Sequence, residues 1–94
     1  MRSTREVLAS VEIDGVEVVC RFADLLVVER EDGSVDWECV LLTVEGPPIE
    51  LTPVHVRLGG YDDTLRRGDA IVVRSDGTSH VLRGVGALTD AGPP

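Results

Sequence analysis

The chain has 94 residues, of which 43% are hydrophobic, and its net charge is −8, as expected for one folded domain rather than a disordered segment. The negative charge opposes binding to nucleic-acid phosphates, and no apolar run approaches the roughly 20 residues of a membrane span. We therefore expect a cytoplasmic protein that binds neither nucleic acid nor membrane. Val and Leu dominate the apolar residues, and the branched Val side chain favours strands.

The first predicted hairpin folds about Asp14-Gly15. An Asp-Gly pair between apolar runs is a strong hairpin signal, because a two-residue type I′ turn needs positive φ at both central positions. Folding the chain there produces one wholly apolar face, which we expect to line the core. The pairs on that face are Ile13 with Val16, Val11 with Val18, Ala9 with Cys20, and Val7 with Phe22.

A second hairpin is predicted about Asp32-Gly33, again with a two-residue turn. Its cross-strand pairs would be Val28 with Trp37, Leu26 with Cys39, and Asp24 with Leu41. The opposite face is acidic near the turn and apolar towards the base. We therefore expect the tip to project into water while the root is buried on both sides.

The third hairpin is predicted about Asp76-Gly77. Its pairs would be Val73 with His80, Ile71 with Leu82, Val72 with Val81, and Arg74 with Ser79. Both faces are apolar near the base, which favours a central position in the sheet.

Residues 49–58 form a further predicted strand, in which Val54, Val56 and Leu58 share one face. Pro53 cannot donate a ladder hydrogen bond, so this strand should be an edge or be bulged there. Residues 59–69 are expected as the longest loop, with a helical turn over residues 64–67 closed by Gly68. Residues 1–5 and 89–94 are expected to be frayed tails.

About seven strands in a chain of this length fit one all-β domain over residues 1–94. Two architectures are open, a small antiparallel barrel or a two-sheet sandwich. The consecutive, strongly twisted hairpins favour the barrel.

The chain contains four residues of types that bind zinc: Cys20, Cys39, His55 and His80. None is paired at the short spacing of a zinc motif, so we expect neither metal nor cofactor, and we interpret both cysteines as reduced, packed thiols. Catalytic residues are not expected either, because Ser79 and its neighbour His80 point to opposite faces of one strand.

The loop over residues 59–69 carries the residues most typical of an interface. Tyr and Arg often anchor protein contacts, and long loops in compact domains are often functional. The candidate binding residues are Tyr61, Asp62, Asp63, Arg66 and Arg67. The leading hypothesis is a non-catalytic β-domain that binds a protein partner or assembles with itself, through this loop and the edge strand over residues 49–58.

An alternative hypothesis is a barrel that binds a small apolar or cationic molecule, with or without weak enzymatic activity. Trp37, His55 and His80 are the side chains available to hold such a ligand.

Overall fold

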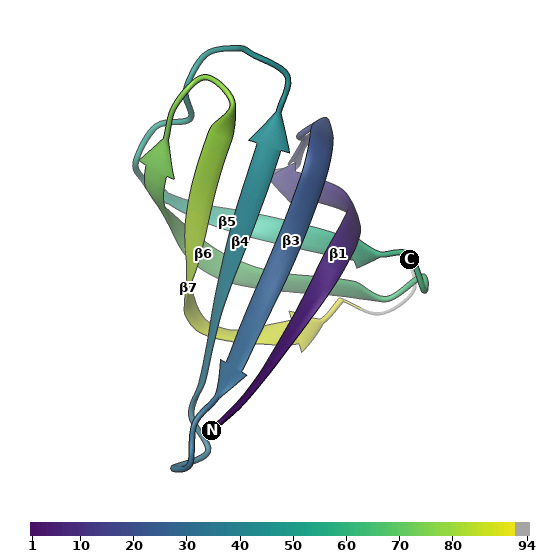
Figure 1. The fold of residues 1–94 in the computed structure, drawn as a ribbon, viewed down its shortest axis with the longest axis vertical. Helices are drawn as coiled ribbons and strands as arrows, with labels where there is room; N and C mark the ends of the chain where they lie inside the picture. Colours follow the sequence, from purple (N-terminus) through teal and green to yellow (C-terminus); the bar gives the residue numbers. More distant parts are fainter. Residues whose placement is uncertain (92–94) are drawn as a thin grey trace.

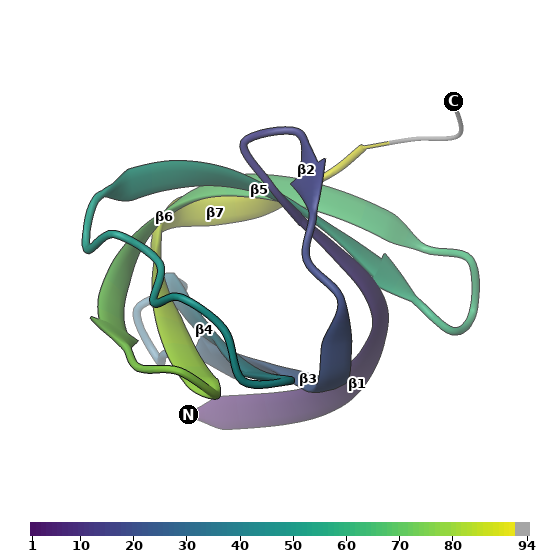
Figure 2. The ribbon, with the colours of Figure 1, turned by 90° about the horizontal axis from the view of Figure 1, so that it is seen from above.

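The computed structural model of the protein describes residues 1–91 and contains seven strands in that range. They are β1 (Arg2–Ile13), β2 (Val16–Glu17), β3 (Cys20–Glu29), β4 (Val35–Thr43), β5 (Pro53–Gly60), β6 (Leu65–Ser75) and β7 (Ser79–Asp90). Six strands close an antiparallel barrel in the order β1-β3-β4-β7-β6-β5, and β2 is a short extra strand beside β1 (Figures 1 and 2). The predicted small antiparallel barrel is therefore confirmed. Within residues 1–91, no helix is long and apolar enough to span a membrane.

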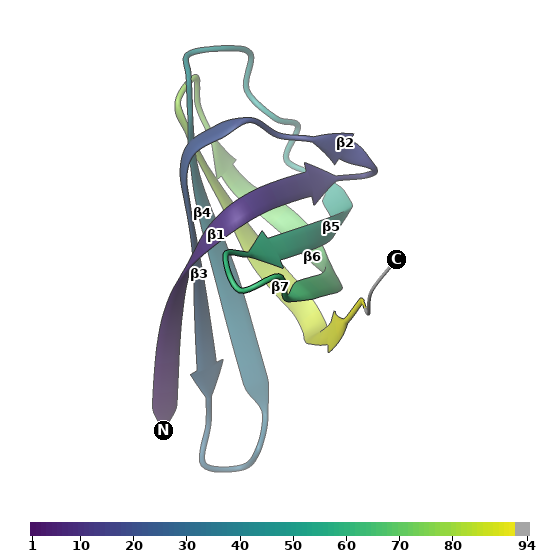
Figure 3. The same ribbon diagram turned by 90° about the vertical axis from the view of Figure 1, so that its right-hand side faces the viewer.

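Strand β1 closes the barrel by changing its partner halfway along. Its residues 2–7 pair with β3, whereas its second half, from Leu8 to Ile13, pairs with β5. A bulge between Leu8 and Ser10 accompanies the change. The first half of β1 continues with β3 and β4 beyond the rest of the barrel, towards the N-terminus and the β3–β4 turn (Figure 3).

The barrel interior is filled by aliphatic side chains and one indole. The buried apolar residues are Leu8, Val11, Ile13, Ala23, Leu25, Trp37, Cys39, Leu41, Val54, Val56, Leu58, Ala70, Val72 and Leu82. Burying a large aliphatic side chain contributes about 1.5–3 kcal/mol, so this set is the main source of stability. The predicted inward face of Val54, Val56 and Leu58 is confirmed.

Trp37 joins β4 to β7 at the end where these two strands separate. The indole packs against Gly84 of β7, and its Nε1–H donates to the carbonyl oxygen of Gly86 at 2.9 Å. Gly86 has a φ of +83°, a conformation that side chains disfavour. A side-chain hydrogen bond therefore links the strands beyond the end of their ladder.

The first hairpin follows the predicted register only near its turn. Ile13 pairs with Val16, and Val18 donates to the carbonyl of Val11 at 2.8 Å. The ladder then breaks at Val18 and Val19, and Val7 pairs with Asp24 instead of Phe22. The predicted inward face is consequently wrong in part, because Val7, Ala9, Val16 and Phe22 are exposed.

The second hairpin has a longer turn than predicted. Arg30 donates to the carbonyl of Ser34 at 2.8 Å, so three residues form the loop, with Gly33 at a φ of +86°. This shifts the register by one residue and exchanges the two faces of β3. The observed pairs are Val27 with Trp37, Leu25 with Cys39, and Ala23 with Leu41. Asp24, Leu26 and Val28 therefore lie on the outer face, and not on the face of Trp37, Cys39 and Leu41 as the predicted pairs required.

The third hairpin also has a longer turn than predicted. The Asp76 carboxylate accepts from the backbone N–H groups of Thr78 and Ser79, and Ser75 pairs with His80. A bulge between Val72 and Arg74 then adjusts the ladder. The predicted pairs are corrected to Val72 with Leu82, Ile71 with Arg83, and Arg74 with Val81.

The expected long loop over residues 59–69 is a tight hairpin turn. β5 extends to Gly60 and β6 starts at Leu65, so the predicted helical turn is extended strand. Asp62 Oδ1 accepts from the backbone N–H and the hydroxyl of Thr64, and Asp63 has a φ of +66°. The longest connection is instead residues 44–52, between β4 and β5.

The predicted edge strand lies inside the barrel wall. β5 pairs with β6 on one side and with β1 on the other. Where the β1 ladder ends, Asp14 exchanges hydrogen bonds with His55: its N–H donates to the His55 carbonyl, and its Oδ1 accepts from the His55 N–H, both at 2.8 Å. Pro53 is the first strand residue, a position that tolerates a missing donor.

The two expected tails are mostly strand. Residues 2–5 pair with β3, and residues 89 and 90 pair with β6. Of the C-terminal segment, residues 92–94 lie outside the described residues.

Candidate protein-binding surface

Two of the three aromatic side chains of the protein lie on its outside, close to each other. We call the surface formed by Val7, Arg21, Phe22, Leu42 and Tyr61 the outer patch. The exposed fractions are 44% for Val7, 43% for Phe22, 40% for Leu42 and 76% for Tyr61. Phe22 and Leu42 are direct cross-strand partners on β3 and β4, and Val7 lies diagonally opposite Phe22 on β1. The patch is therefore continuous across three strands.

Phe22 stands between two hollows of the outer patch. The smaller has a volume of about 80 Å³ and is lined by Val7 and Tyr61, among others. The larger, of about 330 Å³, is lined by Leu42 and by residues at the adjoining end of the barrel. Arg21 and Phe22 line both hollows, because a bulge between Cys20 and Phe22 leaves Arg21 outside the regular alternation of β3.

Asp24 is buried beside the outer patch although it belongs to the outer face of β3. It lies between Val7 and Val40 in the ladder and is 7% exposed. Its Oδ2 accepts from Arg5 Nη1 at 2.7 Å, whereas the buried Oδ1 has no hydrogen-bond partner. A buried acceptor without a partner costs about 1–3 kcal/mol. In return, the carboxylate holds the Arg5 guanidinium over the edge of the patch.

Of the predicted binding residues, only Tyr61 belongs to the outer patch. The Asp62 carboxylate is part of the turn, and hydrogen bonds from Thr64 lower its pKa. Asp63 occupies the left-handed position of the same turn. Arg66 forms a half-buried ion pair with Glu6.

Arg67 lies within β6, where it pairs with Arg57 and Thr89. Sequence reasoning missed Val7, Phe22 and Leu42 as surface residues. It assigned Val7 and Phe22 to the core because it assumed one uninterrupted ladder. Their exposure depends on the break after Val18, for which the local sequence carries no turn signal.

Trp37, His55 and His80, proposed to hold a small ligand, lie in separate surroundings. Trp37 is in the packed interior. His80 is buried between two hydroxyl groups, with Nδ1 2.6 Å from Ser75 Oγ and Nε2 3.0 Å from Thr43 Oγ1. Ser75 Oγ also accepts from the Ile49 N–H at 2.7 Å, so this chain of contacts anchors the 44–52 connection to the barrel.

His55 points outward from β5 and is half-exposed. Its Nδ1 is 3.0 Å from Asp69 Oδ1, in an open hollow of about 470 Å³ whose apolar side includes Ile71 and Val85. A His–Asp pair can move a proton, but it lies on β5 and β6, whereas Trp37 and His80 belong to β4 and β7. The structure therefore does not bring the three side chains together.

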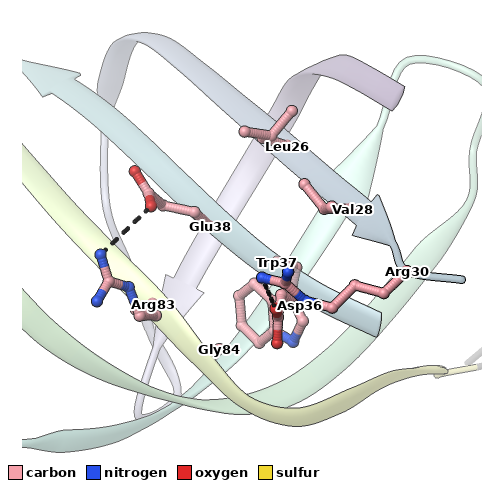
Figure 4. A pocket seen from close by; sticks show the side chains of 8 residues that line it. All are labelled: Leu26, Val28, Arg30, Asp36, Trp37, Glu38, Arg83 and Gly84. Carbon is pink, nitrogen blue, oxygen red and sulfur yellow. Dashed lines mark hydrogen bonds and ion pairs between the residues drawn. The ribbon is translucent and has the colours of Figure 1, made fainter. Parts of the chain in front are cut away.

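Another groove, of about 350 Å³, lies on the outer face of β3, β4 and β7 (Figure 4). Leu26 and Val28 form its apolar part. Its charged side chains pair with each other: Arg30 binds Asp36 at 2.6 Å, and Arg83 approaches Glu38 at 3.9 Å. The groove thus offers no surplus of either charge to a ligand.

The two cysteines are free thiols. Burial raises the pKa of Cys39 to about 12 and also raises that of Cys20. Within residues 1–91, no group of three or more His, Cys, Asp or Glu side chains is arranged to hold a metal ion. Comparison of the chain with protein-family models, curated proteins and solved structures finds no match.

Proposed function

We propose that this protein is a non-catalytic β-barrel that binds another protein through the outer patch. The observation that carries the proposal is the outward placement of Phe22 and Tyr61 in a protein with only three aromatic residues. Aromatic and Arg side chains are the commonest energetic centres of protein interfaces. Here a Tyr, a Phe and an Arg surround two adjoining hollows.

The chemistry of the outer patch defines the partner segment that it fits. The hollow of about 330 Å³ beside Phe22 and Leu42 can receive an apolar or aromatic side chain. Arg21 lines the same hollow and can pair with a carboxylate. The net charge of −8 opposes an acidic partner over long distances, but physiological salt screens charges beyond about 8 Å. We therefore expect a segment with an apolar anchor next to an Asp or Glu.

Selection from a displayed random-peptide library tests this proposal. We expect peptides that carry an aromatic or aliphatic residue beside an acidic one. Their binding should weaken about 30-fold or more, or about 2 kcal/mol, with Phe22→Ala or Tyr61→Ala. Arg21→Glu should remove the preference for the acidic residue. Tyr61→Ala should leave the melting temperature unchanged, because this side chain is mostly exposed.

Ile71→Ala is the matched control, because Ile71 is as exposed as Leu42 but lines the separate hollow beside His55. It should leave peptide binding intact. NMR titration of the labelled protein with a selected peptide should shift resonances of residues 20–23, 40–43 and 61. Shifts confined to other strands, or peptides that bind Phe22→Ala as tightly as the unchanged protein, would refute the proposal.

A further inference from the structure

The first half of β1 has an unpaired edge. Residues 2–7 bond to β3 on one side, and pairing with β5 on the other side begins only at Leu8. Within residues 1–91, no strand covers the free edge of residues 2–6. Free edges present backbone donors and acceptors to any other extended chain, and proteins usually obstruct them with charges, bulges or loops.

The charged residues of this edge complement those of a second copy of the same strand that runs in the opposite direction. When two copies of β1 run antiparallel with Thr4 opposite Thr4, each Arg2 faces the second copy's Glu6, and each Ser3 faces an Arg5. This register uses the whole free edge. A slip by one residue in one direction places Arg2 opposite Arg5, and like charges directly opposite are destabilising. A slip in the other direction separates Arg2 from Glu6.

We infer that this protein forms a twofold dimer by antiparallel pairing of the β1 edges in the Thr4-centred register. The Arg66 ion pair occupies Oε1 of Glu6, so the second carboxylate oxygen is available for Arg2 of the other copy. The twofold axis of such a pair is perpendicular to the sheet, so both outer faces point to the same side. If the proposed function holds, the dimer presents two outer patches to one partner surface, which increases avidity.

Cysteine cross-linking tests the register. In Thr4→Cys, the two thiols should lie opposite each other across the axis, with Cα atoms about 4.5–5.5 Å apart, within disulfide range. In Ser3→Cys, the two copies of the residue should be about 8 Å apart, too far for a bridge. Both variants are made in Cys20→Ser protein to remove the half-buried thiol. We expect disulfide dimers under mild oxidation from Thr4→Cys alone; equal cross-linking of both variants, or of neither, overturns the inference.

Charge reversal provides an independent measurement on the full chain. Arg2→Glu places like charges opposite each other in the dimer, as does Glu6→Arg combined with Arg66→Glu, which keeps the internal ion pair. Each of these two variants alone should dimerise at least tenfold more weakly than the unchanged chain, whereas a mixture of the two variants should form heterodimers. Because a contact of this size is weak, native mass spectrometry and sedimentation should extend to about 1 mM in 0.15 M salt.

A monomeric unchanged chain at the highest concentration, or a mixture that stays monomeric, overturns the inference. Phe22→Ala separates this inference from the proposed function, since it should weaken peptide binding about 30-fold or more and leave the dimer intact. Dimers that disappear with Phe22→Ala would place the contact on the outer patch instead of on β1.

Discussion

Gly84→Ala is the substitution that best tests how the barrel closes between β4 and β7. A Cβ atom at Gly84 would overlap the Trp37 indole, with Cε2 and Nε1 as its nearest atoms. Gly68 also lies close to the indole, since a Cβ there would come within 3.1 Å of Cζ2, so the space around the ring is limited. The ring must therefore rotate or β7 must move away from β4, and either movement breaks the Nε1–H bond to Gly86.

The expected loss of stability follows from these two contacts. Forcing one extra carbon into a packed core typically costs about 1–3 kcal/mol. Losing the hydrogen bond to Gly86 adds about 1 kcal/mol. We therefore expect Gly84→Ala to lower the free energy of unfolding by about 2–4 kcal/mol. For a chain of this size, that corresponds to a fall in Tm of roughly 10–25 °C.

Trp37 is the only tryptophan, so its fluorescence reports both unfolding and its own environment. Urea titration should show an earlier midpoint for Gly84→Ala and an altered native emission. Gly46→Ala is the control, since a Cβ there meets only the Val44 carbonyl oxygen at 3.7 Å. In a Trp37→Leu background, where unfolding is monitored by circular dichroism, Gly84→Ala should lower the free energy of unfolding much less. An unchanged midpoint, or an equal cost with and without the indole, would refute this account of the closure.

Two further predictions concern the ionisable groups. Hydrogen bonds within the turns lower the pKa of Asp32, Asp62 and Asp76. The ionised carboxylates therefore stabilise the folded protein above about pH 4. This stability is lost as the pH falls through the lowered pKa values of the folded state. Calorimetry between about pH 5 and 2 should show a smaller fall in Tm after all three are changed to Asn; an identical fall would contradict this. With a pKa of about 12, Cys39 is about 1 part in 10⁴ thiolate at pH 8, so iodoacetamide should alkylate it only in urea. Rapid labelling of the native protein would show that the interior is open.

The positions of the three Asp-Gly turns could be predicted from the sequence, but two of them are longer than the predicted two-residue turn. Asp14-Gly15 forms the two-residue turn expected of it. In each of the three longer turns, an Asp accepts from the backbone N–H of a Ser or Thr two residues later. These pairs are Asp32 with Ser34, Asp62 with Thr64, and Asp76 with Thr78. Val16 follows Asp14 at that spacing and has no hydroxyl, so Asp-x-Ser/Thr is a local signal that separates the two turn types here.

The outer patch could not be derived in the same way. Tyr61 was identified from its residue type and its place in a connection. The sequence pattern predicts Phe22 in the core because an uninterrupted first hairpin pairs it with Val7, whereas Val7 in fact pairs with Asp24. A slip of one residue exchanges the two faces of a strand, and apolar residues occur on both sides of β3. Local pattern therefore cannot decide which apolar residues face outward.

Sequence alone determined the all-β class, the positions of the three Asp-Gly turns and the inward face of β5. These features depend on neighbouring residues: Gly or Asp at positive φ, apolar alternation, and Asp side chains that close turns. Tertiary structure decided the closure of the barrel, the change of partner along β1, the free edge of residues 2–6 and the exposure of Phe22. Each of these depends on pairing between strands that are distant in the chain. The choice among such pairings depends on which of them buries the whole set of core side chains together, which no local segment encodes.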